Sequence, residues 1–186
     1  GILQSFSLYK KALENLNWET SFFKKEGFNL VELYEDKPFE VKIPKNAKNI
    51  AGVKIEIRPI NEDEFNLTID TEIIRDGRKQ PLRVNQKGKF DALVKTQNFE
   101  FILTRKDCTI GQTYFLVFND INSLAQSYLK QVKISLEDKK SELINVQLIG
   151  SNPKKSADFI NELNHVFISY GVKKKKNDSF MRNVFS

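Results

Sequence analysis

The sequence is poor in the side chains that carry most enzyme chemistry. One cysteine, Cys108, and one histidine, His165, occur in 186 residues. These counts exclude an internal disulfide and a zinc site made of several cysteine and histidine ligands, and they argue against a Cys–His or Ser–His relay. The glycine-rich motifs of dinucleotide-binding and P-loop proteins do not occur either. We therefore predict that no residue of this chain is catalytic, binds a cofactor or ligates a metal.

Long apolar runs are also missing. No stretch approaches the roughly 18 to 20 apolar residues of a membrane span, and the N-terminus lacks the basic and then apolar layout of a signal peptide. A helical pattern begins directly at Gly1 without a cap, and the chain stops at Ser186 without a terminating signal. We therefore expect a segment excised from a longer protein, in which case the missing signals say nothing about its compartment.

A surplus of positive charge is concentrated at the C-terminus. The chain has 30 Lys and Arg against 24 Asp and Glu, a net charge of +6. Residues 172–186 hold Lys173–Lys176 and Arg182 against Asp178, whereas a nucleic-acid surface needs basic residues spread over a folded face. We predict a solvated tail or helix extension that binds no nucleic acid, with attraction to membrane headgroups as the alternative.

Helical patterns occur near both ends of the chain. Five apolar residues recur at helical steps near the N-terminus and predict one stripe of a helix: Ile2, Phe6, Tyr9, Leu13 and Leu16. Near the other end, Asn152–Pro153 predicts a helix start, because Asn caps free amides and Pro has no amide to satisfy. That helix continues to at least Tyr170 on a stripe of Ala157, Ile160, Leu163 or Asn164, and Phe167. Each stripe forms either intramolecular core or a subunit contact.

The middle of the chain alternates between apolar and polar residues. The alternating segments are separated by polar turns and begin at Val53, Phe65, Leu82, Phe99 and Tyr114. A period of two predicts antiparallel sheet with one buried face, here in a small sandwich-like or barrel-like lobe. A short helix at 119–129 and strands at 131–136 and 143–149 follow. The predicted class is α+β, with helices at both ends packed with a mixed or antiparallel sheet, plus the β-rich middle lobe.

Carboxylates occur in three clusters, at residues 35–36, 62–64 and 137–138. A glycosidase needs two such groups converging across a cleft, with the pKa of one raised by burial. Each cluster lies at a predicted turn, where carboxylates are usually solvated, so we do not expect catalysis from them. His165 and Cys108 are interpreted as an ordinary helix residue and an ordinary loop residue.

Two regions resemble the extracytoplasmic part of chain-length-determinant proteins of the Wzz and GumC type, which accompany exopolysaccharide export. The first is SFSLYKKALENLNWETSFFKKEGFNLVELYEDKPFEVKI, at residues 5–43. The second, at residues 110–171, is the more specific match. Its N-P-x-x-x-A-x-x-x-N-x-L element falls on Asn152, Pro153, Ala157, Asn161 and Leu163. Between the two regions the likeness is loose, apart from FDALVKTQNFEFIL.

The resemblance implies the periplasmic domain of a bacterial inner-membrane protein, with a transmembrane helix removed on each side. It divides the chain into a membrane-proximal α/β part, residues 1–43 and 105–186, and an inserted β-rich lobe, residues 44–104. It also implies a ring-like homo-oligomer, with a polysaccharide polymerase and an outer-membrane export protein as partners and no cofactor. In many members a cytoplasmic tyrosine autokinase follows the second transmembrane helix, but nothing in these residues encodes that kinase.

The leading functional hypothesis is therefore a non-catalytic domain of a polysaccharide co-polymerase, which regulates the chain length and export of exopolysaccharide or capsule by oligomeric scaffolding. One alternative is a glycan-binding β module of a cell-envelope protein, in which the lobe holds sugar by aromatic stacking and polar contacts. The other is an enzyme with a carboxylate pair that acts on sugar. Saturable binding of an oligosaccharide would favour the glycan-binding module. An activity that survives the change of each turn carboxylate to its amide would exclude the enzyme.

Overall fold

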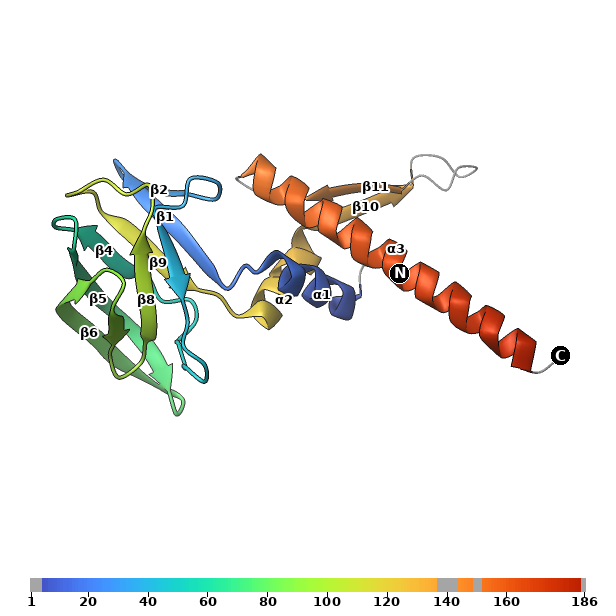
Figure 1. Ribbon diagram of the computed structural model, residues 1–186, viewed down its shortest axis with the longest axis horizontal. Helices are drawn as coiled ribbons and strands as arrows, with labels where there is room; N and C mark the ends of the chain where they lie inside the picture. Colours follow the sequence, from blue (N-terminus) through green and yellow to red (C-terminus); the bar gives the residue numbers. More distant parts are fainter. Residues whose placement is uncertain (1–4, 137–143, 149–151, 185–186) are drawn as a thin grey trace. The chain divides into compact units, whose positions relative to one another are not determined.

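The computed structural model describes residues 5–136, 144–148 and 152–184. The chain divides into two units, one of residues 19–120 and one that joins residues 1–18 to residues 121–186. The first, the β unit, is built from strands, and the second, the helical unit, contains the helices and one hairpin (Figure 1). The predicted α+β class, with a β-rich middle and helices near both ends, is confirmed.

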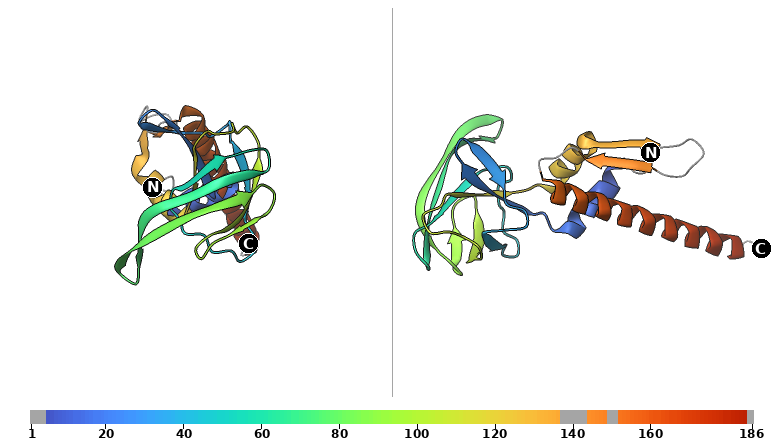
Figure 2. Two further views of the ribbon diagram at one scale, coloured as in Figure 1. Left: turned by 90° about the vertical axis from the view of Figure 1, so that its left-hand side faces the viewer. Right: turned by 90° about the horizontal axis from the view of Figure 1, so that it is seen from above.

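The β unit holds two antiparallel sheets (Figure 2). The larger has the order β2-β1-β9-β4-β5-β6, and its strands are β1 (Thr20–Glu26), β2 (Asn29–Glu32), β4 (Ile55–Pro59), β5 (Glu64–Arg75), β6 (Arg78–Lys89) and β9 (Tyr114–Phe118). The smaller has the order β3-β8-β7, and its strands are β3 (Phe39–Lys42), β7 (Leu93–Lys95) and β8 (Glu100–Arg105). Neighbouring strands run antiparallel in both sheets, as the alternating pattern predicts.

The core of the β unit lies between the two sheets. Alternate residues of each strand point into it, because successive side chains of a strand face opposite sides. The ring of Phe39 in the small sheet lies 5.3 Å from that of Tyr114 in the large sheet, and the rings of Phe101 and Phe118 lie 5.6 Å apart. These contacts between the sheets make the β unit a sandwich with an aromatic core.

The β unit is larger than the expected inserted lobe of residues 44–104. β1 pairs with β9, and β9 pairs with β4, so strands from both sides of that lobe complete the large sheet. β3 likewise completes the small sheet by pairing with β8. The division therefore falls at Trp18 and Ile121 instead of at the expected boundaries, because pairing between strands far apart in the sequence decides it.

The helical unit is built around α1 (Phe6–Leu16), which contacts both α2 (Ile121–Gln131) and α3 (Pro153–Val184). Between α2 and α3 the chain forms an antiparallel hairpin of β10 (Val132–Leu136) and β11 (Ile144–Leu148). α3 continues without interruption beyond Tyr170, the residue that the sequence predicts it to reach at least. No helix in the described ranges combines the length and the apolarity that crossing a bilayer requires.

The buried face of α1 overlaps the predicted stripe and is wider than it. Tyr9 and Leu13 are fully buried, and Leu8 and Ala12 lie buried beside them. The rest of the stripe is less covered: Phe6 is 37% exposed, Leu16 is half-buried, and Ile2 lies outside the described residues. Contact with both α2 and α3 explains the extra width, since two neighbours cover more of a helix than one.

The buried face of α3 differs from the predicted stripe. Within residues 153–171 of α3, Phe159, Leu163 and Val166 are buried. Leu163 belongs to the predicted stripe, whereas the predicted Ala157 is exposed, and Ile160 and Phe167 are half-buried. Both sets have helical spacing, so the pattern alone does not choose between them. The choice comes from packing, because the large ring of Phe159 meets Tyr9 and Trp18 in the core of the helical unit.

Candidate functional site

The start of α3 is formed by the first two residues of the family-like element. The side-chain oxygen of Asn152 accepts a hydrogen bond of 2.9 Å from the amide of Lys155, and its carbonyl accepts one of 3.0 Å from the amide of Ser156. Pro153 is the first helical residue, where its missing amide costs nothing. The predicted capping role of Asn152 is thus confirmed.

The other three residues of that element have different environments. Leu163 is fully buried in the helical unit, whereas Ala157 and Asn161 are exposed. Ala157 and Asn161 lie one turn apart on the same side of α3, since residues four apart on a helix are neighbours. The element therefore combines a helix start, one core residue and two surface residues.

A groove of about 260 Å³ lies at the junction of α1 and α3. Its lining is mainly apolar and comes from these two helices: Leu8, Lys11, Asn15, His165, Val166, Ser169 and Tyr170. His165 is exposed at this groove. Among the described residues, no three His, Cys, Asp or Glu side chains gather closely enough to hold a metal ion.

The core beside this groove is an aromatic cluster. The rings of Tyr128 and Phe159 lie 4.4 Å apart, and the ammonium of Lys155 lies 4.8 Å from the centre of the Trp18 ring. The hydroxyl of Tyr9 is buried without a hydrogen-bond partner among the described residues. Burial raises the pKa of Tyr9 to about 12, so this hydroxyl is neutral and suits packing more than proton transfer.

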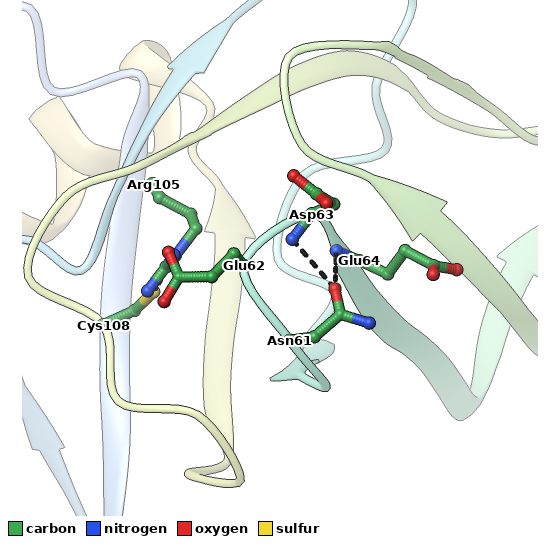
Figure 3. A network of polar contacts seen from close by, with 6 residues as sticks. All are labelled: Asn61, Glu62, Asp63, Glu64, Arg105 and Cys108. Atoms are coloured by element: carbon green, nitrogen blue, oxygen red, sulfur yellow. Dashed lines mark hydrogen bonds and ion pairs between the residues drawn. The ribbon is translucent and has the colours of Figure 1, made fainter.

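The acidic turn at residues 61–64 is built for local structure. The side-chain oxygen of Asn61 accepts hydrogen bonds of 2.8 Å from the amides of Asp63 and Glu64, which is an Asx turn. Figure 3 shows the carboxylates of Glu62, Asp63 and Glu64 pointing in different directions. They do not converge as the two carboxyl groups of a glycosidase must. The cluster at residues 35–36 is exposed, and the cluster at 137–138 lies outside the described residues.

Glu62 and Cys108 both contact Arg105, at the end of β8 (Figure 3). Glu62 forms an ion pair with the guanidinium, and Nε of Arg105 donates a hydrogen bond of 3.3 Å to Sγ of Cys108. The hydrogen bonds to Cys108 and Glu62 raise the pKa of Arg105, and its guanidinium also lies over the Phe90 ring. This network ties the acidic turn and the Cys108 loop to the small sheet.

One feature is not predicted from the sequence, a row of side chains across the outer face of the larger sheet. Strand register places these residues directly opposite one another, in the order Glu32, Phe23, Phe115, Glu56, Thr68 and Asn85. Their chain neighbours point into the core, as Phe22, Leu116 and Leu67 do. The six residues, called the outer row below, therefore face away from it.

A sequence signal for the outer row does exist. β1 contains Phe22–Phe23 and β9 contains Tyr114–Phe118, which are continuous apolar runs in place of strict alternation. A continuous run indicates a strand whose two faces both carry apolar side chains. The run alone does not show which residues of other strands stand beside the outward rings.

Two comparisons with known proteins bear on the identity of the chain. No protein-family model matches the sequence, and no curated protein gives a significant match.

Proposed function

We propose that the chain is the non-catalytic periplasmic domain of a bacterial inner-membrane polysaccharide co-polymerase, which oligomerises and regulates the chain length and export of exopolysaccharide or capsule. The observation that carries this proposal is the joining of α1 to α3. The two regions with the family resemblance, residues 5–43 and 110–171, lie far apart in the sequence, yet they supply α1, α2 and the capped half of α3 to one unit.

The order of residues along the contact between α1 and α3 suits a domain held between two membrane anchors. Asn15 in α1 meets Glu162 in α3, and the groove lined by Leu8 and Lys11 extends along α3 to Tyr170. The helices thus run in opposite senses where they touch. A segment preceding α1 would therefore leave the domain on the same side as the C-terminal part of α3. In the proposed protein, both transmembrane helices would join the domain on that side.

The surface of α3 offers a contact for the proposed ring. Ala157 and Asn161 are exposed, and Ile168, two turns further along the same side, is 63% exposed. Small side chains allow another helix to approach closely, and an exposed Ile gains from being covered. We propose this surface as a subunit contact, with the polysaccharide polymerase and the outer-membrane export protein as the further partners.

Deletion of the parent gene tests the proposal directly. We expect the length distribution or the yield of surface polysaccharide to change, and the full-length protein to restore it. Ala157→Arg in the full-length protein should restore it poorly, because a bulky charge would occupy the proposed contact. Asn122→Arg, at an exposed position of α2, is the matched control. An unchanged polysaccharide profile after deletion would contradict the proposal.

A further inference from the structure

Two phenylalanines interrupt the polar outer face of the larger sheet. Phe23 and Phe115 lie opposite each other on β1 and β9, which are interior strands of that sheet. Both rings are only half-buried, and neither belongs to the core between the sheets, although Phe22 and Leu116 beside them do. A face that only meets water would carry polar residues at these positions, because exposed apolar area is unfavourable.

The size of this apolar area argues against a protein partner. It comprises Phe23, Phe115 and the next outward residue of β9, Val117, all half-buried, together with Leu30 on β2, which is 39% exposed on the same face. In the outer row, Glu32 and Glu56 bound the two rings on either side. A stable protein–protein interface takes about 800 Å² from each partner, far more than these four side chains expose. A ligand only a few rings long matches the area.

The polar members of the outer row match a ligand rich in hydroxyl groups. The carboxylate of Glu56 accepts hydrogen bonds, and the side chains of Thr68 and Asn85 both donate and accept them. These three residues lie in register with the two rings. Lys25 lies on the same side of β1 as Phe23, and Lys54 and Arg58 lie on the same side of β4 as Glu56. The rings are thus bordered by charges of both signs, which favours a ligand without net charge. Stacking together with neutral hydrogen bonding is the chemistry of a sugar chain.

We infer that the outer row binds a neutral glycan. The apolar faces of successive pyranose rings stack on Phe23 and Phe115, and sugar hydroxyls hydrogen-bond to Glu56, Thr68 and Asn85. Glu32 and Glu56 are three strand spacings apart, about 14 Å, which exceeds the ~5–9.5 Å between the carboxyl groups of glycosidases. The row therefore holds the glycan without cleaving it. The inference rests on the proposed function in one respect: the glycan would be the exported polymer.

Titration of the chain with neutral hexose oligomers tests the inference. The probes are maltohexaose, cellohexaose, laminarihexaose and mannohexaose, followed by calorimetry and by chemical-shift changes. We expect saturable binding of at least one probe. Phe115→Ala and the nearly isosteric Glu56→Gln should each weaken it about tenfold or more. Phe28→Ala is the matched control, because Phe28 is a fully exposed phenylalanine at the tip of the β1–β2 hairpin, away from the row.

Several results would overturn the inference: no binding of any of the four probes, equal weakening by Phe28→Ala, or equal binding of the acidic polymer polygalacturonate. The Glu56→Gln variant keeps the test valid if Phe115→Ala unfolds, which thermal unfolding would reveal. Glycan binding together with an unchanged polymer length after gene deletion would contradict the co-polymerase proposal and keep the outer row. A changed polymer length without glycan binding would support the co-polymerase proposal and contradict glycan binding by the outer row.

Discussion

Asn15 in α1 donates a hydrogen bond of 2.9 Å from Nδ2 to Oε1 of Glu162 in α3, which joins residues 147 positions apart in the sequence. Both side chains are at the surface. Beneath them, the buried faces of α1 and α3 meet through Tyr9 and Phe159, whose rings pack edge to face at 5.6 Å. The hydrogen bond therefore orients a contact whose stability comes mainly from the apolar core below it.

A double-mutant cycle of Asn15→Ala and Glu162→Ala should give a coupling energy below about 1 kcal/mol, because the pair is exposed to water. Urea unfolding followed by the fluorescence of Trp18 is a suitable measurement. Trp18 is the only tryptophan in the chain, and it packs on Tyr128 and Phe159 in the same unit. A coupling of several kcal/mol would show that the hydrogen bond itself holds the helices together.

Asn152→Ala should lower the free energy of unfolding of the helical unit by about 1 kcal/mol, because the amide of Lys155 loses its capping acceptor. The same Trp18 fluorescence transition measures this loss. Asn161→Ala is the control, since Asn161 is exposed on the same helix and its removal should change the free energy by less than about 0.5 kcal/mol. Equal effects of the two substitutions would contradict the capping role.

Gly88→Ala should destabilise the β unit by about 1–3 kcal/mol through overpacking. A Cβ atom at Gly88 would collide with the ring of Phe65, which is fully buried and cannot move aside freely. Thermal unfolding followed by circular dichroism measures the loss. Gly171→Ala is the opposite case: its Cβ atom meets nothing within 4 Å, and we expect a gain of about 0.5–1 kcal/mol from helix propensity. A stable Gly88→Ala protein would refute the steric argument.

The buried hydroxyl of Tyr9 should make the stability of the helical unit depend on alkaline pH. Burial raises the folded-state pKa to about 12, above the value of about 10 in an unfolded chain. The resulting stability is fully present below pH ~10 and is lost as the pH rises towards 12. Between pH 9 and 11 we expect the free energy of unfolding to fall by about 1 kcal/mol more in the native chain than in Tyr9→Phe.

Urea unfolding of both proteins at several pH values checks this prediction. At neutral pH the Tyr9→Phe protein should be at least as stable as the native chain, because the lost hydroxyl has no partner among the described residues. Tyr170→Phe, at a tyrosine that is 45% exposed, controls for general effects of high pH. Parallel pH profiles for the native and Tyr9→Phe proteins would show that the hydroxyl is hydrated after all.

The elements themselves were largely predictable, because their signals are local. Asn152 and Pro153 adjoin each other in the sequence, and together they place the start of α3 at the observed residue. The alternating segments likewise predict β4, β5, β6, β8 and β9. The buried face of α3 was predicted less well, because Ala157 and Phe159 both belong to helical stripes, and only the contact of Phe159 with Tyr9 and Trp18 decides between them.

The candidate site was the least predictable part. The acidic cluster at residues 62–64 belongs to a turn, as the hydrogen bonds to Asn61 and the Glu62–Arg105 pair show. The outer row draws on six strands, so its members become neighbours only through the register of the sheet. Glu56 and Thr68 carry no motif that would mark them in isolation.

The sequence by itself determined the α+β class, the capped start of α3, the alternation of the strands and the scarcity of cysteine and histidine. Each of these depends on residues close together in the chain or on composition alone. Only the tertiary structure decided that β1 lies beside β9 and that Phe23 stands opposite Phe115. The reason is that strand pairing links distant segments, and a shift of one residue in β1 would turn Phe23 from the outer face into the core.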